Sequence, residues 1–215
     1  MLHYEKEYHD IFHPDLIKDN GYYFLRSKLA FIRYFNELDK DKRILEYGVG
    51  LGQNIYLFKD RFGYDVSKFA LDFIEKKGYR VFSTIEEIPE NYFDIILCCH
   101  VLEHLENPFD TIVTLKSKLK TTGKLILVLP KEFHGKAAIE MSPEQHLYCW
   151  NFRNINNLLI HSGLKVISNK QFAGTGYHIL SFLAKINFRV WKLSTLLLGT
   201  VLNRKELVIT AIKGK

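Results

Sequence analysis

RILEYGVGLGQN, from Arg43 to Asn54, is the most informative stretch of this chain. A short apolar run leads to an acid, Glu46. Three glycines follow at alternate positions, namely Gly48, Gly50 and Gly52. Glycine at this density indicates that the backbone turns tightly or that it lets a ligand come very close. A dinucleotide, a phosphate and a nucleoside are the candidate ligands, and each implies a different class of protein.

Two common nucleotide-binding motifs do not fit this glycine pattern. A phosphate-binding loop places Lys-Ser or Lys-Thr directly after its last glycine, whereas Gly52 is followed by Gln53 and Asn54. A dinucleotide fingerprint that starts at Gly48 needs its third glycine at the position of Gln53. The remaining interpretations are a loop that approaches a nucleoside-like ligand and a tight strand-to-helix turn that binds nothing.

Composition and length indicate a globular protein with one substantial core. The chain has 215 residues, of which 47% are hydrophobic and 25% are charged, as expected of a folded domain. Cys98, Cys99 and Cys149 have neither the number nor the spacing of a disulfide framework or of a paired metal site. Because the N-terminal stretch is polar and has no signal-peptide pattern, we expect a cytoplasmic protein.

The net charge of +6 is concentrated in the C-terminal part of the chain. Residues 185–215 carry seven cations and one anion, so residues 1–184 sum to zero. A neutral main body lacks the basic surface by which proteins bind nucleic acid. The sequence therefore predicts no nucleic-acid partner.

Hydrophobic patterning predicts alternating strands and helices. Apolar runs are typical of strands at 42–48, 62–67, 79–84, 93–99, 124–130, 164–172 and 206–213. Apolar residues at helical spacing occur at 22–38, 52–61, 67–78, 108–123 and 151–163. This alternation favours an α/β fold, doubly wound, with a mostly parallel sheet and helices on both faces. Ligands of such sheets bind beyond the carboxyl ends of the strands, where the glycine stretch is expected to lie.

Further motifs follow the glycine stretch. They are GYDVS, FDIILCCHVLEHLENP, GKLILVLP and EQHLYCWNFRNINNLLIHSGLKVI. Together with ILEYGVGLG, and in this order over residues 20–175, they resemble the class I S-adenosylmethionine-dependent methyltransferases. The strongest resemblance is to the branch that includes the ubiquinone-biosynthesis O-methyltransferases. It implies a Rossmann-like sheet of seven strands whose last strand lies antiparallel next to the sixth.

The resemblance also implies a domain organisation and a cofactor. One methyltransferase domain, 1–215, would comprise an N-terminal helical segment, 1–40, a cofactor-binding half, 41–130, and a substrate-side half, 131–215. The implied cofactor is S-adenosyl-L-methionine. The residues that the resemblance assigns to its binding are Arg26, Glu46, Gly48, Gly50, Asp65, Val66, Thr84, Ile85, Cys99 and His100.

Each of these residues has an expected role. Gly48 and Gly50 would let the backbone approach the methionine and ribose portion. Asp65 would accept hydrogen bonds from the ribose hydroxyls, as acids in nucleotide folds do. Arg26 would meet the methionine carboxylate, for which a guanidinium is well suited, or would lie on a solvated helix face. Around the adenine we expect Val66, Thr84 and Ile85, with Cys99 and His100 on the other side of the cofactor.

One spacing departs from the family pattern. Only twelve residues separate Gly52 from Asp65, which is fewer than the resemblance leads one to expect. The first helix is therefore expected to be short, or the second strand stunted.

Methyl transfer from a sulfonium needs a positioned acceptor and a group that takes its proton. His134 and His146 follow the fifth strand, where an acceptor would enter, and they are the catalytic candidates. His104 and the preceding Glu103 do not form a His-Glu-x-x-His motif, and a structural role is favoured for both. No metal is predicted, because no histidine spacing requires one.

The segment 179–202 has the pattern of a basic amphipathic helix. Lys185, Arg189 and Lys192 would share one helical face, with aliphatic residues on another. Three cations within the run argue against a membrane span. The segment is then either a peripheral membrane contact or a helix packed on its own domain or on a second subunit.

The sequence thus favours a methyltransferase that moves a methyl group to an oxygen, in preference to nitrogen or carbon, of a small-molecule or lipid- or glycan-linked acceptor. The alternative is a non-catalytic module that binds S-adenosylmethionine as a scaffold or regulator. A nicotinamide oxidoreductase is disfavoured by Gln53. Oligomeric state is not predicted.

Overall fold

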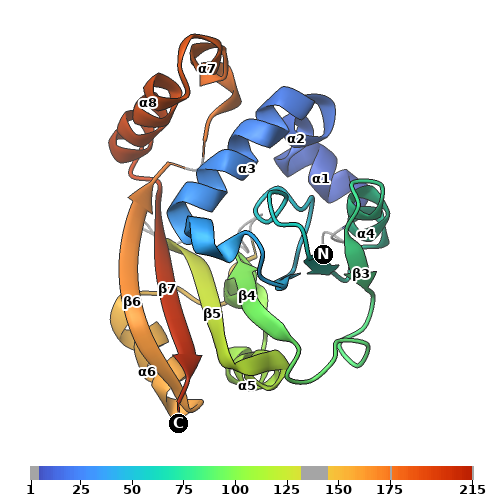
Figure 1. Ribbon diagram of the computed structural model, residues 1–215. Coiled ribbons are helices and arrows are strands. Elements are labelled where there is room, and N and C mark those ends of the chain that lie inside the picture. Colours follow the sequence, from blue (N-terminus) through green and yellow to red (C-terminus); the bar gives the residue numbers. More distant parts are fainter. Residues whose placement is uncertain (1–4, 132–144, 175, 215) are drawn as a thin grey trace.

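One seven-stranded sheet, in the order β3-β2-β1-β4-β5-β7-β6, forms the centre of the computed structural model (Figure 1), which describes residues 5–131, 145–174 and 176–214. The strands are β1 (Ile44–Tyr47), β2 (Arg61–Tyr64), β3 (Arg80–Phe82), β4 (Phe93–Cys99), β5 (Leu119–Lys131), β6 (Leu164–Ala173) and β7 (Lys205–Lys213). Neighbouring strands among β1 to β5 pair in parallel, and β7 runs antiparallel between β5 and β6. The predicted fold class and the antiparallel last strand are confirmed.

The strand order reverses between β1 and β4. From β1 the chain extends to β2 and β3 on one side, and β4 then lies on the other side of β1. In open α/β sheets this reversal leaves a crevice beyond the carboxyl ends of the two strands. Tyr47, the last residue of β1, pairs with Cys98 of β4. The glycine stretch therefore begins at the crevice.

Helices cover both faces of the sheet, as predicted. The longer ones are α3 (Asn20–Tyr34), α4 (Lys68–Glu75), α5 (Pro108–Lys118) and α6 (Phe152–His161). Leu115 of α5 and Leu159 of α6 lie in one buried cluster with Ile96 of β4. Its neighbour Ile95 faces the opposite way, into a cluster with Ile74 of α4. Alternate residues of β4 thus serve two separate cores, which explains why this strand is apolar at every position except Asp94.

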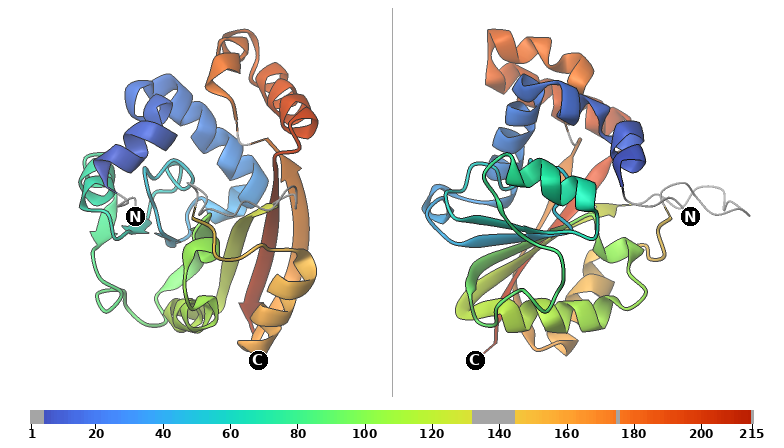
Figure 2. Two further views of the ribbon diagram at one scale, coloured as in Figure 1. Left: turned by 180° about the vertical axis from the view of Figure 1, so that it is seen from behind. Right: turned by 90° about the vertical axis from the view of Figure 1, so that its right-hand side faces the viewer.

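Two short helices precede α3 and lie across one end of the sheet. They are α1 (Lys6–Phe12) and α2 (Pro14–Lys18). The carboxylate of Glu5 accepts hydrogen bonds from the backbone N–H groups of Lys68 and Phe69, both at 3.1 Å, at the start of α4. This contact holds α1 against α4, over the end of the sheet where the glycine stretch lies (Figure 2).

The predicted helix at 52–61 does not form, and that prediction was wrong. Turns occupy residue 51 and residues 53–57, and β2 is only four residues long. Ile55 and Phe58 from this connection are buried in the cluster that contains Ile74. Because the connection must return along the sheet within thirteen residues, its apolar side chains fill the core from turns instead of from a helix.

Two other helices differ from their predicted bounds. α3 begins at Asn20, before the predicted start, because Asp19 accepts a hydrogen bond from the N–H of Tyr22 at 3.0 Å and caps the helix. Leu38 lies instead in a separate 3₁₀ turn, η1 (Glu37–Asp39). The predicted helix 108–123 ends at Lys118, and the residues that follow extend β5, because Leu119 pairs with Phe93 of β4.

The segment 179–202 is two helices and not one. η3 (His178–Leu180) and α7 (Phe182–Ile186) are followed by α8 (Phe188–Val201). The break falls at Asn187, whose side chain accepts a hydrogen bond from the N–H of Arg189 at 2.7 Å and caps α8. Lys185 therefore lies on a different helix from Arg189, contrary to the sequence prediction. Among the helices of the described ranges, none has the length and apolar character needed to cross a membrane.

Candidate functional site

A cavity of about 1300 Å³ opens beyond the carboxyl ends of β1 and β4. It is lined by most of the residues that the sequence assigned to the site: Arg26, Glu46, Gly48, Gly50, Asp65, Val66, Cys99, His100 and His146. Thr84 and Ile85 are not among its lining residues: Thr84 is exposed, and Ile85 packs against the core on the α5 side. His134 lies outside the described residues. The cavity thus brings together elements that are far apart in the chain.

The glycine loop enters the cavity in a left-handed backbone conformation. Gly48 and Gly50 have φ values of 70° and 49°, which side chains with a Cβ rarely adopt. A Cβ at Gly48 would also overlap the side chain of Val101. The N–H groups of Gly48 and Val49 donate to the carbonyl of Tyr64, at 2.8 and 2.9 Å, and so tie the loop to the end of β2. The glycines are therefore required by the turn itself, before any ligand is considered.

Asp65 links this loop to the start of α4. One carboxylate oxygen accepts from the N–H of Gly50 at 2.8 Å, and the other accepts from the N–H of Ser67 at 2.9 Å. Burial raises the pKa of Asp65, and the two backbone hydrogen bonds oppose that shift. Each oxygen of a carboxylate has two lone pairs, so both retain capacity to accept from a ligand in the cavity.

Glu46 is the most deeply buried acid of the cavity wall. It is 1% exposed, and Asn54 donates to its Oε1 at 2.6 Å. Its other oxygen, Oε2, has no hydrogen-bond partner among the described residues. Burial raises the pKa of Glu46 to about 8, although the Asn54 hydrogen bond acts in the opposite direction. An unpartnered buried carboxyl oxygen beside a cavity is well placed to receive a cationic or hydrogen-bond-donating group.

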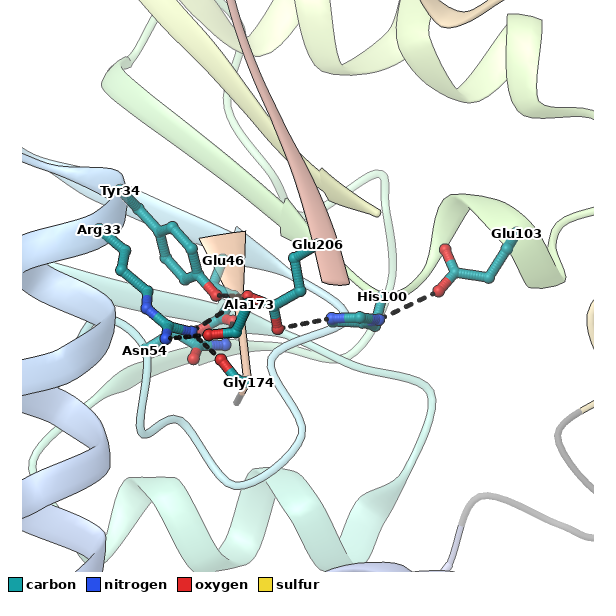
Figure 3. Close-up of polar contacts among 9 residues, drawn as sticks. All are labelled: Arg33, Tyr34, Glu46, Asn54, His100, Glu103, Ala173, Gly174 and Glu206. Carbon is teal, nitrogen blue, oxygen red and sulfur yellow. Dashed lines mark hydrogen bonds and ion pairs between the residues drawn. The ribbon is translucent and has the colours of Figure 1, made fainter. Parts of the chain in front are cut away.

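His100 is held between two buried acids (Figure 3). Its Nε2 lies 3.2 Å from Oε1 of Glu206, and its Nδ1 lies 3.4 Å from Oε1 of Glu103. Burial lowers the pKa of His100, but the two acids outweigh it and raise the pKa to about 10. Glu206 is in turn fixed by Arg33 and by the hydroxyl of Tyr34 at 3.0 Å. His100 is thus a charged and restrained group and is unsuited to take a proton.

The N-terminal helices supply cavity residues that the sequence analysis missed. His9 of α1 is 4% exposed, lines the cavity, and neither of its ring nitrogens has a hydrogen-bond partner within the described part of the chain. His13 also lines the cavity, and burial lowers its pKa to about 4. A pair of histidines four residues apart beside Tyr8 and Phe12 was the available signal, since it is unusual in a segment otherwise rich in charge.

His146 lies beside His104 at the edge of the cavity. The two rings meet edge to face with centroids 4.7 Å apart. Ligand atoms of Glu103, His104 and His146 lie within 4.8 Å of one another, so these residues could hold a metal ion. The sequence did not predict this cluster as a metal site, because Glu103 and His104 are far from His146 in the chain.

The protein has the class I methyltransferase fold. This class is defined by the strand order, the glycine loop after β1 and the acid after β2. Residues 18–169 match the family described as "Methyltransferase domain", and the chain belongs to this family. The resemblance to class I S-adenosylmethionine-dependent methyltransferases is confirmed. The narrower resemblance to ubiquinone-biosynthesis O-methyltransferases stays a prediction.

Two curated relatives and many solved structures are similar to this chain. The uncharacterized protein MJ1123 of Methanocaldococcus jannaschii is 35% identical over 111 residues, which cover 49% of this chain and 54% of that protein. MJ0638 of the same organism is 34% identical over 97 residues, which cover 43% of each chain. The chain thus aligns with only about half the length of the curated relatives it matches.

Similar solved structures support the fold. A SAM-dependent methyltransferase from Archaeoglobus fulgidus has a TM-score of 0.60 at 19% identity, with 94% of this chain and 99% of that chain covered. Burkholderia thailandensis 1,6-didemethyltoxoflavin-N1-methyltransferase, solved with bound 1,6-didemethyltoxoflavin and S-adenosylhomocysteine, has a TM-score of 0.61 at 16% identity, covering 97% and 84% of the two chains. At these identities the structures show a shared fold.

Proposed function

We propose that this protein transfers a methyl group from S-adenosylmethionine to an oxygen of a small-molecule or lipid- or glycan-linked acceptor. The observation that carries the proposal is the placement of Asp65 and the glycine loop on one cavity at the strand-order reversal. The cavity volume of about 1300 Å³ exceeds the usual range for a single ligand, which leaves room for cofactor and acceptor together.

The polar groups of the cavity match the parts of the cofactor. Asp65 would accept from the ribose hydroxyls with the lone pairs that its two backbone contacts leave free. Arg26, from α3, would bind the methionine carboxylate. The unpartnered Oε2 of Glu46 would accept from the methionine ammonium group. Val66, with Thr84 and Ile85 after rearrangement of their loop, would enclose the adenine.

His146 is the proposed general base for the acceptor. In the transfer, the acceptor oxygen attacks the methyl carbon in line, a C–O bond forms, and the C–S bond breaks with its electron pair going to sulfur. The acceptor's proton goes to an imidazole nitrogen of His146, which lines the cavity. His134 remains a second candidate for this role. Oxygen is proposed as the acceptor atom, although one of the similar structures is an N1-methyltransferase.

The alternative is a cofactor-binding module without catalysis. It is favoured by one observation: His100, the histidine at the end of β4, is held by Glu103 and Glu206 and is not free to accept a proton. In that case the cofactor would bind but no methyl group would be released to any acceptor. Binding and turnover therefore have to be measured separately.

Calorimetry with S-adenosylhomocysteine tests the cofactor part of the proposal. We expect saturable binding by the wild type and weaker binding by Asp65→Ala. Asp72→Ala, which removes an exposed acid of α4, serves as the matched control. Absence of heat with the wild type would contradict the proposal. Methyl release from labelled cofactor, assayed against lipid, glycan, RNA and protein fractions of an extract, then separates the enzyme from the binding module.

A further inference from the structure

The segment from Ile179 to Leu202 exposes an unusual number of large apolar side chains. Of the twenty such side chains that are exposed in the described residues, nine lie in this segment. They are Ile179, Phe182, Ile186, Val190, Leu193, Leu196, Leu197, Val201 and Leu202, here called the apolar face. Exposed hydrophobic residues are ordinary when scattered, but a concentration on one pair of helices marks an interaction surface.

Packing of α8 on its own domain does not account for the apolar face. The inner side of α8 is already fixed: Trp191 is fully buried in a cluster with Tyr22 and Leu29 of α3. One and two turns further along, Thr195 and Gly199 are buried, and a Cβ at Gly199 would overlap the backbone of Gly174. The helix is therefore anchored by one side, and its outer side presents aliphatic residues to the solvent.

The charged side chains of the segment itself are of one sign, and the acids Asp15 and Asp19 lie only at its start, where both contact His178. Residues 145–205 contain no Asp or Glu, and five cations lie between 176 and 205: Lys185, Arg189, Lys192, Arg204 and Lys205. Lys185 and Arg189 are exposed beside the apolar side chains. A second copy of this face would bring like charges together, which opposes a symmetric dimer. An anionic surface would instead be attracted to it.

The apolar face is continuous with the mouth of the cavity. Ile179, at the start of the segment, and Arg204, two residues after its end, are both exposed and both line the cavity. Figure 1 shows α7 and α8 beyond the end of β6 and the start of β7, on the same side of the sheet as α1 to α3. A surface that covered the apolar face would therefore meet the cavity opening.

We propose that the apolar face docks on an anionic lipid bilayer. Its aliphatic side chains would enter the boundary between headgroups and acyl chains, and Lys185 and Arg189 would bind anionic headgroups. This inference goes beyond the proposed methyl transfer, because docking requires neither cofactor nor acceptor. If both hold, the cavity mouth lies at the lipid surface, where a lipid-linked acceptor is present.

Co-sedimentation of the full chain with vesicles tests the docking. Phosphatidylcholine vesicles with and without phosphatidylglycerol are the probes. We expect the wild type to sediment with the anionic vesicles and to be released by high salt. Two variants test the apolar and the electrostatic contributions to docking separately. Leu193→Ser/Leu197→Ser/Val201→Ser changes the apolar face, and Lys185→Glu/Arg189→Glu reverses the charge beside it. Each should reduce vesicle affinity at least about tenfold.

The matched control removes exposed apolar residues elsewhere. Ile160→Ser/Ile167→Ser changes side chains that are 60% and 52% exposed on α6 and β6, and it should sediment like the wild type. Since all the substituted residues are exposed, thermal unfolding should be little changed in each variant. Wild-type protein that stays in the supernatant with both vesicles, or variants that sediment as fully as the wild type, would overturn the proposal. So would a dimer in sedimentation velocity that the triple serine variant dissociates.

Discussion

The carboxylate of Glu206, at the start of β7, lies 3.2 Å from Nε2 of His100, at the end of β4 (Figure 3). His100 has a φ of 55°, so its backbone is in the left-handed region, and the side chain reaches Glu206 and Glu103 at once. Arg33 of α3 also contacts Glu206 and donates to the carbonyls of Ala173 and Gly174. One network of polar contacts thus connects the end of β4, the start of β7 and helix α3.

This network predicts that stability falls as pH rises through the alkaline range. The pKa of His100 is raised to about 10 from its ordinary value of 6.5, so its contribution is complete below pH 6.5 and is lost as pH approaches 10. Because the side chain is 37% exposed, solvent screening limits the contribution to about 1 kcal/mol. Asparagine tolerates the left-handed backbone at this position, so His100→Asn should remove this part of the pH dependence of stability.

Denaturant unfolding of both proteins at pH 6.5, 8 and 10 measures the effect. The comparison with the variant isolates His100 from the other groups that titrate in the same range. A difference between the two proteins that stays constant over this pH range would contradict the assignment.

Glu46→Gln is expected to stabilise the protein at high pH while it weakens cofactor binding. Because the pKa of Glu46 is raised from 4.5 to about 8, its ionisation costs no stability below pH 4.5, the loss of stability grows as pH rises from 4.5, and it is complete above pH 8. A neutral amide avoids burying that charge and still accepts from Asn54. At pH 9 the variant should be more stable by on the order of 3 kcal/mol.

The cofactor readout for Glu46→Gln is calorimetry with S-adenosylhomocysteine. Loss of the proposed ammonium contact should weaken binding by about tenfold. Asn54→Ala is the control, because it removes the neighbour of Glu46 without removing the carboxylate. If Glu46→Gln bound S-adenosylhomocysteine as tightly as the wild type, Glu46 would have no role in holding the methionine portion.

Gly48→Ala should destabilise the glycine loop by about 2–3 kcal/mol, since a left-handed backbone and the side chain of Val101 both oppose a Cβ there. Adding Val101→Ala should restore only the part of the lost stability that comes from the overlap with the Val101 side chain. A double-mutant cycle by chemical denaturation, with Val101→Ala alone as the reference, separates the two causes. Full recovery in the double variant would show that the backbone conformation carries no cost.

His146→Ala should lower turnover by on the order of 100-fold and leave S-adenosylhomocysteine affinity unchanged, as expected for a general base that does not touch the cofactor. His161→Ala, on α6 against Phe109, is the control histidine. The assay should also be insensitive to a chelator. Inactivation by a chelator, with recovery on adding a divalent cation, would instead assign Glu103, His104 and His146 to a metal.

Most of the sheet and much of the site followed from local patterns. Strand predictions succeeded where most residues of a segment were apolar, as in β4 and β7, because a buried strand needs apolar side chains on both faces. The prediction of a helix at 52–61 failed because helical spacing of apolar residues does not by itself require a helix. Here the same residues reach the core from turns. The family resemblance assigned Asp65 to cofactor binding from its position after the second strand, and Asp65 lines the cavity.

The sequence by itself determined the class of fold, the glycine loop and the acids beside it, because these depend on residues near each other in the chain and on backbone conformations that only glycine adopts readily. Only the tertiary structure decided which distant groups meet. It placed His9 over the glycine loop, paired His100 with Glu206, and exposed the aliphatic side of α8. Such contacts depend on how helices and strands pack in three dimensions, and the periodicity of a single segment does not encode its partner.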